Sequence, residues 1–258
     1  MTMSAPLEIK PALINFDRLI KIAEQNSTKY QSASPFPHIL LEDFIEQSVL
    51  ELILSLFPSP NTKLNWRKVS AKLENQNVQY NKLGMPHERE VAPIIRRLLW
   101  EMNAGPFLRF LEQLTGIKGL IPDPSLQGGG LHQSLPGGLL GVHADFTRHR
   151  EYDLDRRINV LLYLNKNWQE ENGGHIELWS RDMKRCERRV KPSFGRCLIF
   201  NTDADSFHGH PEPIAGPDGL TRKSIALYYY TNGRSDTVPP TNATDWQRLP
   251  SVVKPELE

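Results

Sequence analysis

The sequence predicts a mainly β domain, a β-sandwich or barrel, with supporting helices in its N-terminal half. Two observations predict this class. The second half of the chain holds short runs rich in β-branched and aromatic residues, separated by turn residues. The first half instead repeats apolar residues at helical spacing and shows no obvious second core. We therefore expect one domain over residues 1–258, in which the helices pack on the β-structure.

The N-terminal half is predicted to hold four helices and one extended segment. Pro58 and Pro60 stop the second helix. Pro106 suits the first turn of the fourth helix, which Gly116 ends. Residues 61–87 are polar and receive no assignment. The predicted helices are 13–30, 42–57, 92–102 and 107–114, and the extended segment is 34–41.

The second half is predicted to hold four strands joined by turns. The six glycines from Gly128 to Gly141 match no phosphate-binding loop and are expected to form flexible loops at the mouth of the β-structure. The polar, proline-rich stretch from Gly233 onward is expected to follow the surface as a tail. The predicted strands are 158–164, 174–179, 196–200 and 224–231.

Charge and composition argue against several classes of protein. The chain has 31 Lys and Arg against 30 Asp and Glu, a formal net charge of +1, so it lacks the basic footprint of a nucleic-acid-binding protein. No apolar run approaches the length of a membrane span. Cys186 and Cys197 are too few for a disulfide framework, and their spacing is not that of a zinc site. We therefore expect a reducing, cytoplasmic location. The oligomeric state is not readable from the sequence.

A histidine-x-aspartate unit, His143 and Asp145, is the first candidate for metal chemistry. On a strand, residues i and i+2 point the same way, so this imidazole and carboxylate could hold one ion. His208, which lies 63 residues after Asp145, is the candidate third ligand. Two histidines and one carboxylate on one face of a metal are diagnostic of non-haem Fe(II) oxygenases. The alternative of a surface histidine beside a turn aspartate stays open, because the pattern is common by chance.

Arg222 is a candidate for binding an anion. It lies 14 residues after His208 and opens a predicted strand. Its guanidinium could hold a carboxylate through two parallel hydrogen bonds. The alternative is a solvated arginine at the end of a strand.

Six short pieces of the second half occur in an order typical of one family. They are Gly141–Phe146, Arg157–Trp168, Gly173–Trp179, Gly195–Phe200, His208–His210 and Arg222–Ser224. The phrase Tyr163-Leu-Asn, followed by Trp168 and a Gly-Gly pair, is more specific than the histidine-x-aspartate unit alone. On these pieces, residues 128–231 resemble the Fe(II)- and 2-oxoglutarate-dependent dioxygenases, specifically their prolyl 4-hydroxylase-like branch.

The resemblance implies a double-stranded β-helix, a form of jelly roll. Residues 126–232 would form this core with the metal site, residues 1–125 a mainly helical support, and residues 233–258 the tail. His143, Asp145 and His208 would bind Fe(II). Arg222 would bind the distal carboxylate of 2-oxoglutarate, and Ser224 could add a hydrogen bond.

The resemblance also implies an activity: hydroxylation of an unactivated C–H bond with O2, releasing succinate and CO2. The substrate would be a small molecule or a peptide, and ascorbate is a further cofactor that the family admits. Asp145 argues against a halogenase, because those members replace the carboxylate with a small residue to admit chloride. Desaturation and ring closure stay open as reaction types.

One position departs from the family pattern. Prolyl hydroxylases often place a tyrosine upstream of the histidine-x-aspartate unit to contact 2-oxoglutarate, and residues 131–138 contain none. His132 or Gln133 could substitute for it or face the substrate. His210, next to Pro211, is interpreted as a rim residue or a structural histidine.

Other patterns are interpreted as structural. His175 and Glu177 are expected to be an exposed pair on a strand, the basic segment 181–196 a solvated hairpin, and Tyr228–Tyr230 alternate core and surface positions. Two other functions were weighed against the dioxygenase. One is a non-catalytic jelly-roll protein that binds a metal or ligand, and no residue favours it. The other is a nucleic-acid demethylase of the same superfamily, against which the near-zero net charge argues.

Overall fold

The computed structural model describes residues 12–62, 64–85, 87–123, 125–236 and 238–258. Residues 1–11, the start of the predicted helical support, lie outside the described part. Two short 3-10 helices, η1 (Glu88–Glu90) and η2 (Glu170–Asn172), accompany the α-helices and strands. The α-helices are α1 (Phe16–Gln31), α2 (Gln47–Ser55), α3 (Pro93–Met102) and α4 (Gly105–Thr115). The strands are β1 (His38–Leu41), β2 (Arg67–Leu73), β3 (Gln76–Gly84), β4 (Ile121–Pro122), β5 (Gly130–Ala144), β6 (Asp155–Tyr163), β7 (Ile176–Trp179), β8 (Cys186–Val190), β9 (Cys197–Asn201), β10 (His208–His210), β11 (Arg222–Thr231) and β12 (Asp245–Trp246).

The helices follow the predicted segments, with one difference at the start of α2. Asn15 caps α1 by accepting a hydrogen bond from the backbone N–H of Arg18 at 3.0 Å, and Gly116 ends α4 in the left-handed region at φ 78°. The prediction that α2 begins at residue 42 is wrong, because Asp43 adopts a positive φ of 50° and breaks the helical path.

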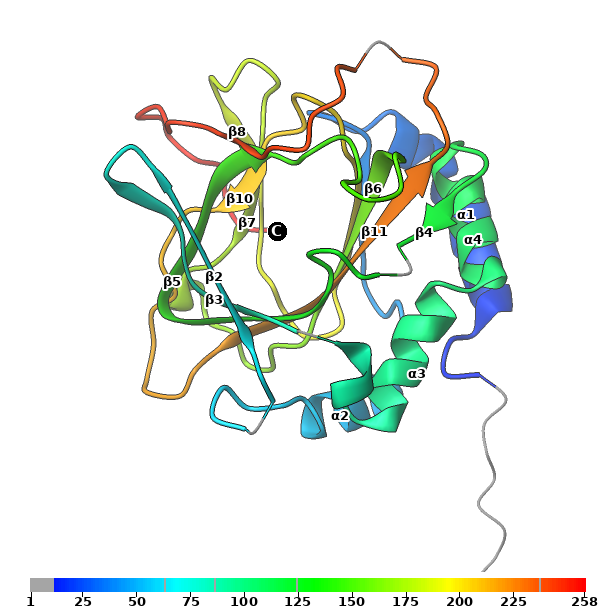
Figure 1. The fold of residues 1–258 in the computed structure, drawn as a ribbon, viewed down its shortest axis with the longest axis horizontal. Helices are drawn as coiled ribbons and strands as arrows, with labels where there is room; N and C mark the ends of the chain where they lie inside the picture. Colours follow the sequence, from blue (N-terminus) through cyan, green and yellow to red (C-terminus); the bar gives the residue numbers. More distant parts are fainter. Residues whose placement is uncertain (1–11, 63, 86, 124, 237) are drawn as a thin grey trace, which may run out of the picture.

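The strands form one antiparallel sheet that curls into a jelly roll (Figure 1). Its order is β1-β9-β6-β11-β5-β10-β7-β8, and β5 belongs to both halves of the curl. The first part of β5 pairs with β11, and its last part pairs with β10. The sequence prediction of a jelly roll with supporting helices is therefore confirmed.

The prediction of flexible loops across Gly128–Gly141 is wrong, because most of this stretch is strand β5. Its glycines let the strand turn the corner of the roll rather than leave the sheet. Gly137 has a positive φ of 73°, and a Cβ on Gly138 would lie 2.6 Å from the carbonyl oxygen of Leu135. A strand with such a bend can pair with both halves of the curl.

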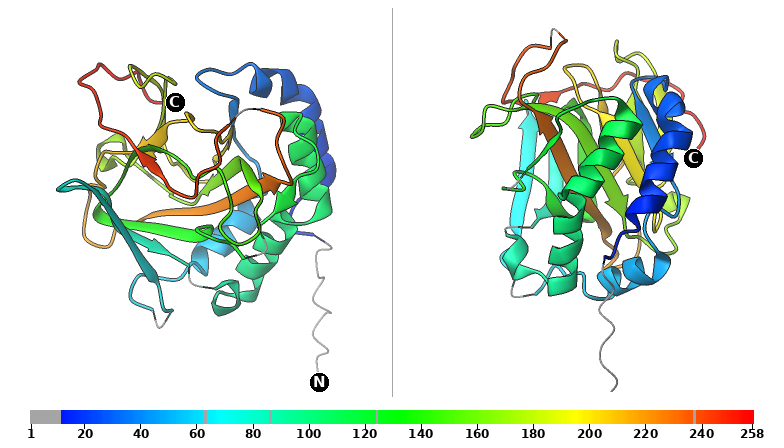
Figure 2. Two further views of the ribbon diagram at one scale, coloured as in Figure 1. Left: turned by 45° about the horizontal axis from the view of Figure 1, so that its top comes forward. Right: turned by 90° about the vertical axis from the view of Figure 1, so that its right-hand side faces the viewer.

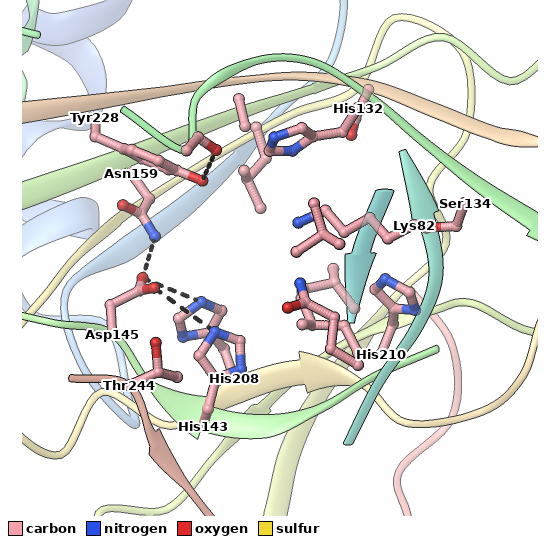
Figure 3. A pocket seen from close by; sticks show the side chains of 18 of the residues that line it. Lys82, His132, Ser134, His143, Asp145, Asn159, His208, His210, Tyr228 and Thr244 are labelled. Carbon is pink, nitrogen blue, oxygen red and sulfur yellow. Dashed lines mark hydrogen bonds and ion pairs between the residues drawn. The ribbon is translucent and has the colours of Figure 1, made fainter. Parts of the chain in front are cut away.

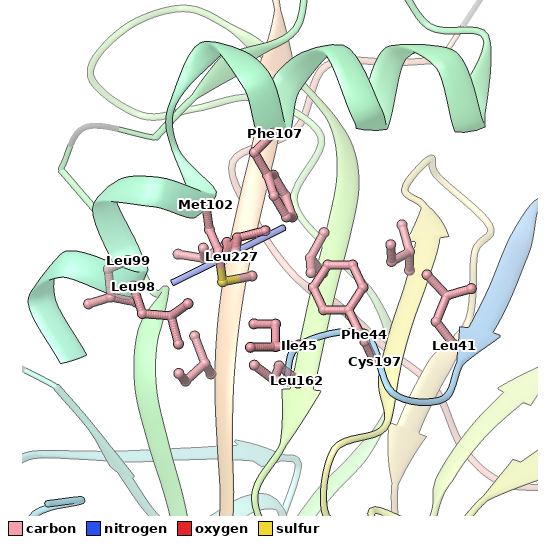
Figure 4. Close-up of a cluster of buried hydrophobic side chains, with 14 of the residues drawn as sticks. Leu41, Phe44, Ile45, Leu98, Leu99, Met102, Phe107, Leu162, Cys197 and Leu227 are labelled. Atoms are coloured by element: carbon pink, nitrogen blue, oxygen red, sulfur yellow. The ribbon is translucent and has the colours of Figure 1, made fainter. Parts of the chain in front are cut away.

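The helices cover one outer face of the sheet, over β6 and β11 (Figure 2). Their apolar sides and the sheet share one buried core rather than two (Figure 4). Phe107 of α4, for example, is fully buried against Phe44 and Phe110 and stacks on Tyr229 of β11 at a centroid distance of 6.0 Å. The helices therefore fix β6 and β11, two of the strands that carry cavity residues.

Two further segments complete the walls of the roll. Residues 67–84, inside the stretch without an assignment, form the β2–β3 hairpin, and β3 pairs with β5. The C-terminal tail returns as β12, where Asp245 and Trp246 pair with Ala144 and His143. Within the described ranges, no helix is long and apolar enough to cross a membrane.

Candidate active site

The three predicted iron ligands meet at the end of β5 and the start of β10. His143 and His208 are direct partners in the sheet register, and Asp145 follows two residues after His143. The Nε2 atoms of His143 and His208 lie 3.6 and 3.5 Å from the two carboxylate oxygens of Asp145. The potential ligand atoms all lie within 4.8 Å of one another. This N,N,O set on one face suits a divalent transition metal with open positions.

Both histidines are oriented to offer the same nitrogen to a metal. Nδ1 of His143 faces the carbonyl of Gly141 at 2.9 Å, and Nδ1 of His208 faces the carbonyl of Ser206 at 2.9 Å. A carbonyl only accepts, so Nδ1 carries the proton and Nε2 keeps its lone pair. Burial and the neighbouring His143 lower the pKa of His208 to about 4, which keeps its ring neutral at pH 7.

Two residues of strand β6 contact the carboxylate of Asp145. Asn159 donates to its Oδ2 at 2.8 Å (Figure 3). The buried guanidinium of Arg156 lies 3.0 Å from the same oxygen. Burial alone would raise the pKa of Asp145, but the Arg156 guanidinium holds it well below its usual range. Asp145 is therefore ionised and fixed in orientation, as a metal ligand must be.

Arg222 and Ser224 line the same cavity as the triad, which has a volume of about 210 Å³. Arg222 is buried, and its Nε donates to the carbonyl of Gly174 at 2.8 Å. Its guanidinium carbon lies 5.0 Å from the ring centroid of Tyr163. The buried hydroxyl of Tyr163 has no hydrogen-bond partner among the described residues. A cation beside an unsatisfied hydroxyl in a buried wall fits a carboxylate, because such a group would satisfy both.

Of the residues left open by the sequence, His132 and His210 line this cavity and Gln133 does not. The side chain of Gln133 instead accepts a hydrogen bond from Thr221 at 2.8 Å. His210 is buried, and its Nδ1 has no hydrogen-bond partner in the described structure. It is therefore not a satisfied structural histidine.

Several residues of this cavity were not among the predicted site residues. Tyr228 lies on it, with the guanidinium carbon of Arg156 3.7 Å from its ring centroid. The prediction of alternating core and surface positions at Tyr228–Tyr230 is thus wrong: Tyr229 and Tyr230 are buried, and Tyr228 faces the cavity. Continuing the period of two from Arg222 and Ser224 would have found it. Trp246 of β12 also lines the cavity, and its ring centroid lies 4.9 Å from that of His143.

The prediction of an exposed His175–Glu177 pair is also wrong, because both side chains are buried. The tail covers them: Lys254 donates to Oε1 of Glu177 at 2.6 Å, and the indole N–H of Trp179 donates to Oε2 at 2.9 Å. Glu212 accepts from the same lysine at 3.4 Å and lies 3.2 Å from Nδ1 of His175. Glu177 is therefore satisfied by the fold and is no second metal ligand.

The basic segment 181–196 is largely neutralised by neighbouring carboxylates. Arg181 pairs with Asp203 and Asp205, and Arg188 pairs with Glu258. These contacts are exposed or half-buried, as predicted for a solvated hairpin, and they offer no free basic surface.

Fold and site together define a jelly-roll protein in which two histidines and one carboxylate that could hold a metal ion line one cavity with a buried arginine. Residues 129–230 match the family model described as "2OG-Fe(II) oxygenase superfamily". The chain is 25% identical over 217 residues to "Prolyl 3-hydroxylase OGFOD1" of Mus musculus, covering 80% of this chain and 34% of that protein. It thus spans about a third of the length of the curated relative it matches.

Solved structures share the fold. A Trichoplax adhaerens prolyl hydroxylase, in complex with a hypoxia inducible factor peptide fragment, matches with a TM-score of 0.57 and 16% identity, covering 83% of this chain and 91% of that one. A prolyl 4-hydroxylase of Phytophthora capsici matches with a TM-score of 0.58 and 16% identity, covering 87% and 68%. The family match and the similarity to a prolyl 3-hydroxylase agree with the predicted resemblance, and the solved structures show a shared fold.

Proposed function

We propose that this protein is an Fe(II)- and 2-oxoglutarate-dependent dioxygenase that hydroxylates a C–H bond of a peptide or small molecule. One observation carries the proposal: His143, Asp145 and His208 line the same cavity as the buried Arg222. The residues fit both cofactors, because the triad offers N,N,O donors and Arg222 offers a cation beside the unsatisfied Tyr163 hydroxyl.

In this proposal each side chain has a distinct task. When bound, Fe(II) and 2-oxoglutarate supply the oxidising chemistry, with release of succinate and CO2. His143 and His208 hold the metal through Nε2, and Asp145 through its carboxylate. Arg156 and Asn159 keep that carboxylate ionised and oriented. Arg222, with Tyr163 and Ser224, neutralises the distal carboxylate of 2-oxoglutarate in a wall that excludes water.

The proposal extends to the substrate class, an accessory reductant and the location. The names of the similar proteins favour a peptidyl substrate, since they include a prolyl 3-hydroxylase and a prolyl hydroxylase bound to a peptide fragment. The family resemblance extends the proposal to ascorbate as an accessory reductant. The two free, buried cysteines support a reducing, cytoplasmic location.

The test is an anaerobic titration of the apoprotein with Fe(II) and then 2-oxoglutarate, followed by the weak visible charge-transfer band of the chelate. We expect a band with wild type, and Arg222→Ala should need about 10–100-fold more 2-oxoglutarate, because a buried charge-assisted pair is lost. Arg185→Ala, an exposed arginine outside the cavity, is the matched control and should behave as wild type. Absence of the band in wild type that has bound iron would refute the proposal.

A further inference from the structure

The cavity holds more positive charge than the proposed cofactors use. Among the described residues that line it, four are basic, namely Arg67, Lys82, Arg156 and Arg222, and Asp145 is the single acid. Arg156 is paired with Asp145 at 3.0 Å. Arg222 is assigned to the distal carboxylate of 2-oxoglutarate, whose other carboxylate would lie at the metal. Two cations, Arg67 and Lys82, are left without an anion.

Both surplus cations come from the β2–β3 hairpin. Lys82 is half-buried and points into the cavity from the side opposite the triad (Figure 3). Neither Lys82 nor Arg67 has a hydrogen bond or ion pair with a carboxylate in the described part of the chain. Arg67 is exposed at the rim of the cavity and can be solvated, whereas the half-buried Lys82 ammonium faces the cavity without a carboxylate partner, so it points to an anionic ligand.

Other polar groups surround the same part of the cavity. Gly84 pairs with Arg67 in the hairpin and with His132 of β5. A Cβ at Gly84 would lie 3.9 Å from Nη2 of Arg67 and 3.8 Å from Cδ2 of His132, so these two side chains flank one gap. His210, 3% exposed and with Nδ1 unpartnered, lies at the Lys82 side of the cavity (Figure 3). The wall thus offers several donors to one group.

The excess of positive charge also affects the pKa of Lys82 itself. Burial and the nearby Arg222 and Arg67 lower the pKa of Lys82 to about 8, and Asp145 offsets this only in part. Burial and the Lys82 ammonium also lower the pKa of His132 well below its usual range. A cluster of this kind is electrostatically incomplete without an anion.

We propose that the substrate carries an anionic group, a phosphate or a carboxylate, which Lys82 and Arg67 bind across the cavity from the metal. This inference rests on the proposed function and names the chemical class of its substrate. The hairpin places the anion opposite the triad, so the C–H bond to be hydroxylated lies between the two. A neutral peptide would leave the Lys82 ammonium in the cavity without an anionic partner.

Calorimetric titration of the anaerobic protein, loaded with Fe(II) and saturating 2-oxoglutarate, tests this proposal. The probes are glycerol 3-phosphate, glycerate and glycerol, which share a backbone and differ in charge. We expect at least one anion to bind wild type and glycerol not to bind. Lys82→Gln should weaken anion binding at least about tenfold, since one charge-assisted hydrogen bond is lost. The anion that binds more tightly identifies phosphate or carboxylate as the recognised group.

Two further variants make the result specific. Lys68→Gln is the matched control, because Lys68 is exposed on β2 of the same hairpin and does not line the cavity. Arg67→Gln changes an exposed residue and should weaken anion binding severalfold even if Lys82→Gln folds poorly. Equal anion affinity of wild type and both cavity variants, or no anion binding to wild type, would overturn the proposal.

The outcome for 2-oxoglutarate separates this proposal from the proposed function. Lys82→Gln should keep the 2-oxoglutarate affinity of wild type. A loss of that affinity would place Lys82 in the cosubstrate site and overturn the inference, while the dioxygenase proposal would stand. Failure of wild type to show the charge-transfer band would instead remove the dioxygenase proposal itself.

Discussion

Lys82 carries a charge that the fold itself does not require. Its pKa falls from 10.5 to about 8 through burial and Arg222, so the protonated lysine destabilises the folded state. This penalty is complete below pH 8 and disappears as the pH rises toward 10.5. Lys82→Met should therefore stabilise the apoprotein at pH 7 by about 1 kcal/mol, or about 2–4 °C in Tm, a modest figure because the side chain is partly exposed.

Thermal unfolding at pH 7 and pH 10 measures this effect, with Lys68→Met as the control. The gain should shrink at pH 10, where the lysine of the folded wild type is already neutral. A lower Tm for Lys82→Met at pH 7 would show that the ammonium stabilises the fold, contrary to the argument.

Residue patterns in the sequence predicted the three candidate metal ligands but not the residues that surround them. His143 and Asp145 could be paired because a strand places i and i+2 on one face, and His208 followed from family order. Arg156 and Asn159 could not be assigned, because their role depends on β6 lying beside the end of β5. The position of Lys82 in the cavity could not be predicted, because the polar hairpin that carries it shows no clear periodicity.

At the scale of elements, the tail does more than follow the surface. Trp246 pairs with His143 through β12, and Lys254 reaches the fully buried Glu177. The sequence could not predict that Glu177 is buried, because the cover comes from a segment 77 residues away with no secondary-structure signal. Long-range contacts of polar side chains leave no periodic trace in a sequence.

Lys254→Met should destabilise the protein by about 3 kcal/mol, because the buried carboxylate of Glu177 then keeps the neutral indole N–H of Trp179 but has as its cationic partner only Arg189, whose Nε lies 4.0 Å away. Adding Glu177→Gln should recover part of this loss, and a double-mutant cycle from urea unfolding gives the coupling. Lys184→Met, which breaks an exposed pair with Asp182, is the control and should cost under about 1 kcal/mol. A loss for Lys254→Met as small as that of the control would mean that Arg189 alone compensates the carboxylate.

At the scale of the whole molecule, the helices and the roll share one core, and the prediction of a single domain can be tested through it. Phe107 of α4 is fully buried and stacks on Tyr229 of β11, a strand that also carries Arg222. Phe107→Ala should cost about 3–5 kcal/mol, because it removes an aromatic ring from both layers at once. If the helices and the roll are one cooperative unit, the loss of stability must lower the unfolding transition of both.

The measurement is thermal unfolding followed by far-ultraviolet circular dichroism for the helices and by tryptophan fluorescence for the roll, where Trp179 is fully buried. In wild type the two transitions should coincide, and in Phe107→Ala both should shift down together by roughly 10 °C. Leu52→Ala, at an exposed position of α2, is the control and should shift neither by more than about 2 °C. A helical transition that moves alone would divide the chain into two units, and the helices would then not hold β11 and its arginine in place.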